Sequence, residues 1–387
     1  MKSQVDIVIV GGGPVGAALA LALRDSGLSV LLLEAHATPG DDPRTLALSY
    51  GTRLILERLG AWGPALPATP IETIHVSQRG GFGRTLLRAA DVRVPALGYV
   101  VRYADLTAAL YQGLPVGGAI EALTGAQVQQ VAATAGYAAV QFVHGHRSHD
   151  VTCRLLVLAD GGRSLRTADG LRLLERDYRQ SALVAQVSSE LPHNNVAYER
   201  FTETGPAALL PHATGFALVW TATPAEAQRL CALDEAQFVE RLHQHFGDRV
   251  GRFVAAGPRA QFPLLLRVAR SIKQKRTVLL GNAAHTLHPV AGQGFNLGMR
   301  GAFSLAAILH DTPPEQVGSA AMLARFASAR RWDVDCAAGA TDLLVRTFSN
   351  ANPLLKLGRG IGLALLDTAP PVRNGLARGM MFGTRGL

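Results

Sequence analysis

The chain has 387 residues, of which 48% are hydrophobic and 17% are charged. These values predict one large domain or two interleaved domains with a buried core, and they exclude a disordered or fibrous protein. The net charge of +9 would suit a nucleic-acid-binding protein, but the Lys and Arg residues are spread along the chain without a recognisable nucleic-acid motif. We therefore expect no nucleic-acid partner, and an anionic membrane surface is the better candidate.

The cysteines and the hydropathy of the chain indicate the cellular compartment of the protein. Cys153, Cys231 and Cys336 are scattered, odd in number and without CxxC spacing, which argues against a disulfide framework or a cysteine metal site. Neither a signal peptide nor an apolar run of the roughly 18–20 residues that span a bilayer is visible. The sequence predicts a cytoplasmic protein that makes at most peripheral contact with the inner face of the plasma membrane.

The N-terminal segment predicts a βαβ unit. VDIVIV (5–10) is typical of a buried parallel strand, GGGPVG (11–16) of a glycine turn, AALALALRDSG (17–27) of a helix and Val30–Leu33 of a second strand. Gly11, Gly13 and Gly16 form the pattern G-x-G-x-x-G. The first glycine permits the turn, the second lets a pyrophosphate approach the backbone, and the third lets helix and strand pack closely.

Glu34 follows the second strand, where a carboxylate accepts hydrogen bonds from ribose hydroxyls and disfavours a 2′-phosphate. The phosphates would lie at the positive end of the helix dipole. The βαβ unit therefore predicts a site for FAD or NAD rather than for NADP.

The remaining segments predict an α/β fold with a second domain inserted into the first. Residues 151–160 and 277–281 are further buried strands, whereas residues 71–102 and 178–266 carry alternating and β-branched stretches typical of antiparallel strands. After Gly301 the pattern is helical. We expect a Rossmann-like cofactor domain (1–70, 101–177 and 267–340), an inserted, mostly antiparallel β-sheet substrate domain (71–100 and 178–266) and a C-terminal helical segment (341–387).

Residues 278–300 read VLLGNAAHTLHPVAGQGFNLGMR. His285 and His288 stand three residues apart, as metal ligands on one helical face would, but no further ligand follows at suitable spacing. We therefore expect no metal. The cluster of Gly292, Gly294 and Gly298 is typical of backbone that wraps a cofactor.

Three signals in chain order resemble the single-component FAD-dependent aromatic hydroxylases, the p-hydroxybenzoate hydroxylase-like group. They are GGGPVG with Glu34, the strand end Asp160-Gly161 followed by Ser164, and the long stretch from residue 279 to 300. The second is similar to the DG motif of that family and the third to its second flavin motif. RTLALS (44–49), the long stretch and the tail TDLLVRTFSNANPLL are most similar to the ubiquinone-biosynthesis branch, in particular to its hydroxylases of 2-polyprenyl-6-methoxyphenol.

The resemblance implies FAD as cofactor and NAD(P)H as a transient reductant. It places Arg44 and Arg102 at the FAD phosphates and ribityl chain, Asp160 near the pyrophosphate and the path of the nicotinamide, and Pro289 beside the isoalloxazine ring. Backbone N–H groups of Phe295, Asn296 and Leu297, at a helix start, would stabilise the anionic reduced ring. The full set of implied cofactor contacts is Gly11, Gly13, Gly16, Glu34, Arg44, Arg102, Asp160, Gly281, Asn282, Pro289, Gly292, Gly294, Phe295 and Asn296.

The chain departs from the family pattern at two positions. Asn282 stands where the family usually has Asp, and it can still accept one hydrogen bond from a ribityl hydroxyl. Arg166 comes one residue earlier than the arginine that normally follows the DG motif, which leaves the nicotinamide contact open.

The activity implied is hydroxylation of the ring of a polyprenylated phenol with O2, by an enzyme that acts alone or within a ubiquinone-biosynthesis complex. No side chain stands out as a catalytic base. His288, His212, Tyr198 and Trp220 could touch a phenol, although a core or surface role is commoner for each type. The segment after residue 340 carries six basic residues against two acidic ones, which would suit docking on an anionic membrane or a solvated helical cap equally.

Other flavoprotein functions stay open at this point. An isoprenoid reductase, a hydroxylase of a different small aromatic compound and a non-catalytic member of a ubiquinone-enzyme assembly would share these motifs. A flavin halogenase would need a W-x-W-x-I-P segment, but Trp62, Trp220 and Trp332 are far apart. A dehydrogenase that uses only nicotinamide would be colourless, whereas a flavoprotein is yellow.

Overall fold

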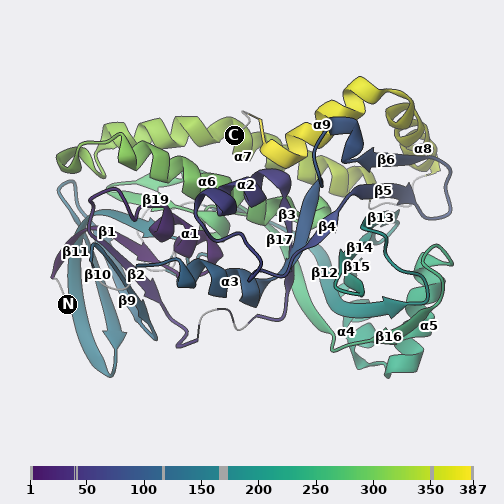
Figure 1. The fold of residues 1–387 in the computed structure, drawn as a ribbon, viewed down its shortest axis with the longest axis horizontal. Coiled ribbons are helices and arrows are strands. Elements are labelled where there is room, and N and C mark those ends of the chain that lie inside the picture. Colours follow the sequence, from purple (N-terminus) through teal and green to yellow (C-terminus); the bar gives the residue numbers. More distant parts are fainter. Residues whose placement is uncertain are drawn as a thin grey trace.

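The computed structural model describes residues 3–38, 40, 42–115, 118–164, 173–348 and 353–384. Two large β-sheets lie next to each other, with a small third sheet between them, and helices cover their outer surfaces (Figure 1).

The first sheet is built around a parallel core. Its strands run in the order β18–β19–β11–β1–β2–β8, and the β9–β10 hairpin continues antiparallel from β11. β1 pairs in parallel with both β11 and β2. The strands are β1 (Gln4–Val10), β2 (Val30–Glu34), β8 (Ile120–Thr124), β9 (Gln127–Ala133), β10 (Ala138–His144), β11 (Arg147–Leu158), β18 (Lys273–Gln274) and β19 (Thr277–Leu279).

The second sheet is mostly antiparallel and runs in the order β20–β17–β12–β15–β14–β13–β5–β6, with β16 beside β12. Only the pair β13–β5 is parallel among its described strands. The strands are β5 (Thr73–Gln78), β6 (Arg84–Arg88), β12 (Leu173–Ser189), β13 (Val196–Thr202), β14 (Gly205–His212), β15 (Gly215–Ala222), β16 (Phe253–Ala256), β17 (Ala260–Ala269) and β20 (His285–Thr286). The small third sheet joins β3 (Thr45–Ser49), β7 (Gly98–Arg102) and β4 (Thr69–Ile71).

The helices lie on the outside of both sheets and across the top of the molecule in Figure 1. They are α1 (Pro14–Ala22), α2 (Tyr50–Arg58), α3 (Tyr103–Gln112), α4 (Pro224–Ala232), α5 (Glu235–Phe246), α6 (Gln293–His310), α7 (Ala320–Phe348), α8 (Pro353–Thr368) and α9 (Pro370–Phe382), with short 3₁₀ helices η1 (Ala90–Val92), η3 (Gly281–Ala283), η4 (Val290–Gly292) and η5 (Pro314–Gln316).

Both faces of the first sheet are covered, which explains its continuous apolar strands. Successive residues of β1 point to opposite faces. Ile7 packs with Leu19 of α1 and Leu305 of α6, whereas Val8 packs with Phe142 of β10.

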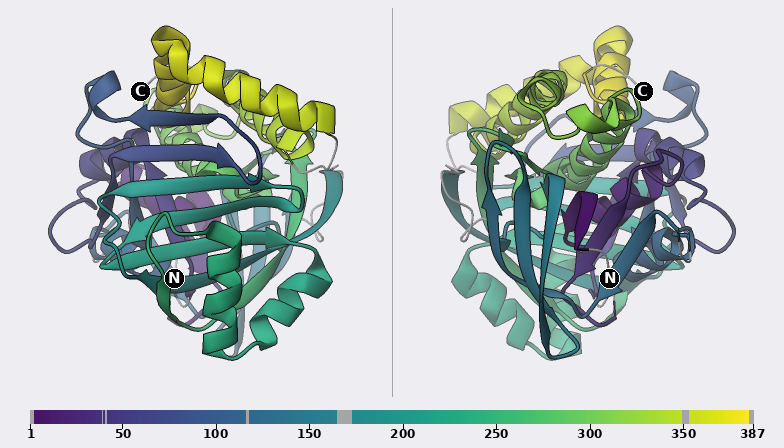
Figure 2. Two further views of the ribbon diagram at one scale, coloured as in Figure 1. Left: turned by 90° about the vertical axis from the view of Figure 1, so that its right-hand side faces the viewer. Right: turned by 90° about the vertical axis from the view of Figure 1, so that its left-hand side faces the viewer.

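The outer face of the second sheet is covered by α4 and α5. Leu183, Leu209 and Trp220 pack there against Phe238 and Leu242 of α5. The left panel of Figure 2 shows these two helices in front of the sheet and the C-terminal helices across its top.

The predicted fold class is confirmed: a Rossmann-like α/β part, a mostly antiparallel second sheet and a helical C-terminus are all present. The ends of individual elements differ. α1 ends at Ala22 rather than near Gly27, and β19 ends at Leu279, so Gly281 and Asn282 lie in η3. The domain boundaries stay a prediction.

Candidate FAD and substrate site

The glycine turn between β1 and α1 is as tightly packed as the G-x-G-x-x-G pattern requires. A Cβ on Gly11, whose φ is +104°, would lie 2.5 Å from the backbone nitrogen of Asp160, and one on Gly16 would lie 2.0 Å from the carbonyl oxygen of Gly11. Gly13 caps the N-terminus of α1, and Pro14 follows it. The turn thus brings the strand, the helix N-terminus and Asp160 together, with the N–H groups of the first helical turn available to phosphate oxygens.

Glu34 fixes the shape of this turn. Its carboxylate is buried, and it accepts hydrogen bonds from the backbone N–H of Gly12 at 2.7 Å and of His36 at 2.9 Å. A carboxylate has about four lone-pair sites, so it can also accept from ribose hydroxyls. The ribose contact stays a prediction.

Two tyrosines of α3, which the sequence did not single out, lie against the glycine turn. A Cβ on Gly12 would lie 2.1 Å from the Tyr111 hydroxyl, and one on Gly13 would lie 3.0 Å from the Tyr103 hydroxyl. The Tyr111 hydroxyl is buried without a hydrogen-bond partner among the described residues. Burial and, to a smaller degree, the negative charge of Glu34 raise its pKa. A neutral, unpartnered O–H beside the turn is a donor for a bound dinucleotide.

Arg44 and Arg102 occupy different surroundings. The guanidinium of Arg44 lies between the rings of Tyr103 and Phe262, 5.8 and 5.3 Å from their centroids, so it bridges α3 and the second sheet. Arg102 is exposed and forms an ion pair with Asp105. Arg44 is therefore adjacent to the glycine turn through Tyr103, and contacts of both arginines with FAD stay predictions.

Asp160 stabilises the turn that follows β11. Its carboxylate accepts hydrogen bonds from the backbone N–H of Gly162 and from the N–H and hydroxyl of Ser164, at 3.0, 2.7 and 2.6 Å. Arg166 lies outside the described residues. The DG motif is thus adjacent to Gly11 and held by these hydrogen bonds, and its contact with the pyrophosphate stays a prediction.

Residues 281–292, which we call the flavin loop, connect β19 to α6. Gly281 has a φ of +56° and packs against α1, and a Cβ on Gly298 would lie 3.2 Å from its Cα. Asn282 is exposed beside it, and Pro289 and Gly292 follow further along the loop. The loop is held against the N-terminus of α1, where the resemblance places the ribityl chain and the flavin ring.

The helix start after the flavin loop differs from the prediction. α6 begins at Gln293 with Gly292 as its N-cap, so Leu297 lies inside the helix, where its N–H is used by the helical ladder. Gly294 and Phe295 lie in the first turn, whose N–H groups have no intrahelical acceptor. Of the three expected donors to the reduced ring, only Phe295 lies among these N–H groups, because the Asn296 N–H pairs in the helical ladder with the carbonyl of the N-cap Gly292.

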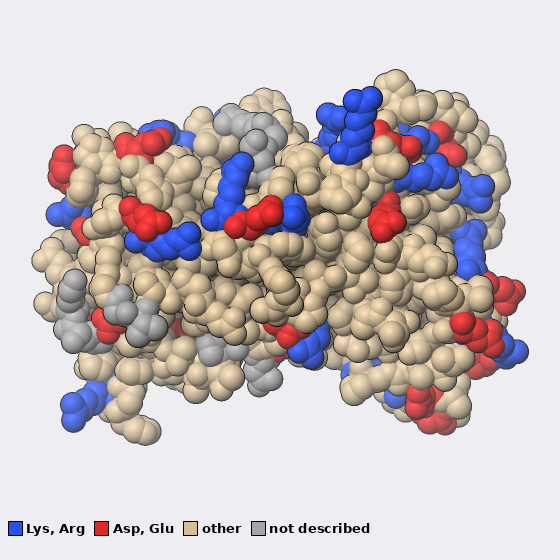
Figure 3. Space-filling model, in the orientation of Figure 1, with Lys and Arg blue, Asp and Glu red and all other residues tan. Residues whose placement is uncertain are grey.

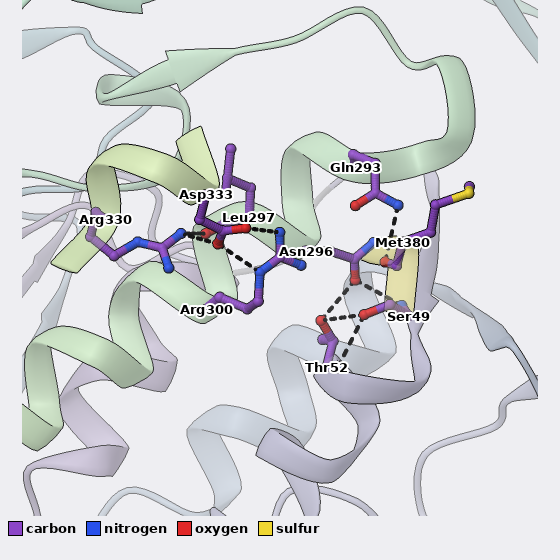
Figure 4. Close-up of polar contacts among 9 residues, drawn as sticks. All are labelled: Ser49, Thr52, Gln293, Asn296, Leu297, Arg300, Arg330, Asp333 and Met380. Atoms are coloured by element: carbon purple, nitrogen blue, oxygen red, sulfur yellow. Dashed lines mark hydrogen bonds and ion pairs between the residues drawn. The ribbon is translucent and has the colours of Figure 1, made fainter. Parts of the chain in front are cut away.

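The Asn296 side chain holds the flavin loop to the chain around residue 49. Its Oδ1 accepts hydrogen bonds from the Ser49 N–H and the Thr52 hydroxyl, both at 2.8 Å (Figure 4). Its Nδ2 donates to the carbonyl oxygens of Ala47 and Gly292 at 2.9 and 2.7 Å. All four hydrogen-bonding positions of the amide are used within the protein. The side chain therefore has no hydrogen-bonding position left for FAD.

A buried ion-pair cluster fixes α6 against α7. Asp333 accepts from Arg300 at 2.9 and 3.1 Å and from Arg330 at 2.7 Å, and all three side chains are at most 8% exposed (Figure 4). Arg330 also donates to the Leu297 carbonyl. The guanidinium groups of Arg300 and Arg330 outweigh burial and keep the pKa of Asp333 below its usual value.

His285 and His288 are buried and neutral. Burial lowers the pKa of His285 to about 3, with Arg330 and Arg300 adding to the effect, and that of His288 to about 4. Both ring nitrogens of His285 lack a hydrogen-bond partner among the described residues. His288 accepts from the Val290 N–H. Within the described residues, no group of three or more His, Cys, Asp or Glu side chains is placed to hold a metal.

The second sheet turns one face toward the flavin loop. Ala197 of β13 packs with Val100 of β7, and Phe201 packs with Val290 of the loop. We call this the inner face. Tyr198 lies between these residues in the strand and therefore points to the opposite, outer face, where it meets Phe216.

The alternation of side chains between the two faces of the sheet separates the candidates for phenol contact. The Trp220 ring packs at a tilt against His245 on the outer face, with ring centroids 4.2 Å apart, so Tyr198 and Trp220 both lie on the face away from the flavin loop. His212, at the end of β14, is close to Arg102. Burial and, to a smaller degree, the positive charge of Arg102 lower its pKa. His288 and His212 remain on the side of the flavin loop.

The residues present fit FAD: two closely packed glycine segments, a helix N-terminus, the buried Glu34 carboxylate and the unpartnered Tyr111 hydroxyl meet at one edge of the first sheet. Asn282 tests this fit. We expect Asn282→Asp to lower the Kd for FAD about fivefold, because a charged acceptor gains roughly 1 kcal/mol over a neutral one. The measurement is titration of the apoprotein with FAD by flavin fluorescence, with Asn282→Ala as a weaker-binding control. Equal binding by the Asp variant would show that Asn282 is tolerated, and weaker binding would show that Asn is the better partner.

Comparisons with known proteins agree with this geometry. Residues 4–332 match the family described as FAD binding domain. The p-nitrophenol 4-monooxygenase PnpA of Pseudomonas putida shares the fold, with a TM-score of 0.79 over 100% of both chains at 18% identity. The predicted FAD cofactor is thus confirmed.

Relatives with higher identity cover nearly the whole chain. The uncharacterized protein slr1300 of Synechocystis is 34% identical over 99% of this chain and 94% of its own length. Ubiquinone hydroxylase UbiL of Rhodospirillum rubrum is 32% identical over 95% of this chain and 87% of its own. The 3-demethoxyubiquinol 3-hydroxylase of Escherichia coli is 32% identical over 95% and 96%. The chain belongs to the FAD binding domain family and, within it, to the group that contains the ubiquinone hydroxylases.

Proposed function

We propose that the protein is an FAD-dependent monooxygenase that hydroxylates the ring of a polyprenylated phenol in ubiquinone biosynthesis, with O2 and NAD(P)H. The observation that carries this proposal is its similarity to two ubiquinone-pathway hydroxylases along nearly their full length. That similarity includes the second sheet, which is expected to hold the substrate, as well as the FAD-binding part.

The chain's own contribution is orientation, charge stabilisation and exclusion of water. FAD held by these residues would supply the redox chemistry that activates O2 for transfer of one oxygen atom to the ring. Gly294 and Phe295, at the positive end of the α6 dipole, favour negative charge at the adjacent flavin edge. Apolar side chains of the inner face, among them Ile74, Val76 and Leu210, are only partly buried, and they offer a dry wall for a phenol and its prenyl tail.

Extraction of quinones from a strain that lacks the gene tests the pathway assignment. We expect an intermediate that lacks one ring hydroxyl to accumulate and complementation to remove it. Normal quinone levels would contradict the assignment, and loss of quinones without any accumulated intermediate would favour a non-catalytic role within a ubiquinone-enzyme assembly.

We further propose that the C-terminal helices dock on the inner face of the plasma membrane, where lipid quinone precursors reside. Among the helices in the described part of the chain, none is both long and apolar enough to span a bilayer. However, α8 exposes Leu357, Ile361 and Leu365, one turn apart, at 51%, 45% and 63%, and α9 exposes Val372 and Leu376. Such a stripe suits insertion at the level of the headgroups.

The charge around this stripe favours an anionic surface. Segments 79–93 and 356–378, which pack together through β6, η1, α8 and α9, carry eight basic and two acidic residues. Figure 3 shows Lys and Arg side chains over this end of the molecule, at the upper right. Each exposed cation near an anionic bilayer contributes about 1 kcal/mol.

Replacement of Ile361 and Leu365 by Asp is expected to reduce binding to vesicles of phosphatidylglycerol and phosphatidylcholine at least tenfold, because two apolar side chains no longer enter the bilayer. Vesicle flotation is the measurement. Val254→Asp, a change at an equally exposed valine of β16, serves as the matched control. Undiminished binding of the double variant would contradict docking through α8.

A further inference from the structure

A carboxylate that the sequence did not single out lies in the middle of the inner face. Glu199 of β13 stands opposite Val76 of β5 and Ala208 of β14. Because side chains alternate along a strand, it shares a face with Ala197 and Phe201, two residues to either side.

These neighbours place Glu199 at the flavin loop. Phe201 packs with Val290, which directly follows Pro289, and two residues along a strand span about 7 Å. On the other side, Ala197 packs with Val100 of the third sheet. Glu199 thus lies between the flavin loop and the sheet that carries Arg102, on the surface where the phenol is expected.

The surroundings of Glu199 are unusual for a structural carboxylate. Its carboxylate has no hydrogen bond or ion pair with any residue that the structure describes, and burial alone raises its pKa to about 7. Nevertheless, its side chain is partly exposed. The carboxylate is therefore accessible from solvent although most of its surface is covered by the protein. Unpaired buried carboxylates are costly, and they cluster at functional sites.

The other titratable groups on this side are weaker bases than an ordinary imidazole or are already paired. Burial, then Arg102, lowers the pKa of His212 on β14, and burial lowers that of His288 in the flavin loop to about 4. From β12, the Tyr178 hydroxyl donates to Asp342 of α7, and burial raises its pKa to about 12. Asp342 is itself paired with Arg176.

We propose that Glu199 is the catalytic base that takes the phenolic proton of the substrate, an inference that rests on the proposed function. In this step the phenolic O–H bond breaks, the proton binds to a carboxylate oxygen of Glu199, and the electron pair stays on the phenolate oxygen. Nothing is oxidised or reduced. The phenolate ring is more electron-rich and accepts oxygen faster. After the ring hydrogen leaves to solvent, Glu199 returns its proton to the phenolate oxygen.

The test compares wild type, Glu199→Gln and Glu199→Asp as FAD-loaded enzymes, with 2-prenylphenol as the probe. For wild type we expect kcat/KM for hydroxylation to rise with pH and to level off above about pH 7, because only the deprotonated carboxylate accepts the proton. The Gln variant should lose this dependence and about 10²-fold or more in rate while keeping its FAD, whereas the Asp variant should keep the dependence at a reduced rate. Glu203→Gln, a change at an exposed residue at the end of the same hairpin, should match wild type.

A second readout needs no turnover. Phenolate absorbs at longer wavelength than phenol, so binding of the probe to oxidised wild type above pH 7 should give a phenolate difference spectrum that Glu199→Gln lacks. Wild-type rate and pH dependence in the Gln variant, or no phenolate signal in wild type that hydroxylates the probe, would overturn the role of Glu199. Absence of any hydroxylation by wild type would instead overturn the proposed function. If the Gln variant does not fold, the wild-type pH profile and difference spectrum decide.

Discussion

Replacement of Gly16 by valine is expected to produce a colourless protein that binds FAD at least 100-fold more weakly than wild type. A Cβ at this position would lie 2.0 Å from the Gly11 carbonyl oxygen, which belongs to the backbone and cannot move without displacing β1 or α1. Either displacement separates the phosphate-binding N–H groups from the glycine turn. The flavin absorbance of the purified protein and an FAD titration measure the effect.

Gly339→Val provides the matched control, because Gly339 is an exposed helical glycine whose Cβ would meet nothing within 4 Å. We expect it to keep its yellow colour and to lose only the modest stability that β-branching costs in a helix. A Gly16→Val protein that retained stoichiometric FAD would contradict the assignment of the glycine turn.

Replacement of Asp333 by Asn is expected to lower the free energy of unfolding by about 3–5 kcal/mol, because two buried guanidinium groups lose their shared carboxylate. The damage should extend to FAD binding. Arg300 belongs to α6, whose first turn follows the flavin loop, and Gln293 in that turn donates to the Met380 carbonyl of α9 (Figure 4).

Urea unfolding and the Kd for FAD measure these two effects. Asp335→Asn is the control, because Asp335 is 64% exposed and its ion pair with Arg331 is long, at 3.7 Å. Loss of this pair should change the free energy of unfolding by about 0.5 kcal/mol or less. Equal stability of the two variants would show that the buried cluster does not hold α6 to α7.

The fold could be predicted because its signals are local. The apolar strands, the glycine turn and Glu34 lie within 30 consecutive residues, and each has a physical meaning that does not depend on distant contacts. The ends of the elements were harder to place. Whether TVLLG ends its strand at Leu279 or at Gly281 depends on η3 and on its packing against α1, which no local pattern encodes.

The residues that face the substrate could not be predicted, because they depend on which side chains of a strand point to the inner face of the sheet. Tyr198 and Glu199 are adjacent, and the sequence favours the aromatic residue as a phenol contact. However, the pairing of β13 with β5 and β14 turns Tyr198 toward α5 and Glu199 toward the flavin loop. A shift of one residue in register would exchange them. The roles of Asn296 and Tyr111 were missed for a similar reason, since their partners are far away in the sequence.

The most direct test of the proposed hydroxylase is the origin of the oxygen in its product. The purified FAD-loaded enzyme is given NADH or NADPH, 2-prenylphenol and ¹⁸O2, and the product is analysed by mass spectrometry. We expect one ¹⁸O atom on the ring, with the prenyl chain unchanged. A product that gains hydrogen in the prenyl chain without oxygen, or NAD(P)H oxidation with no change in the phenol, would contradict the assignment as a ring hydroxylase.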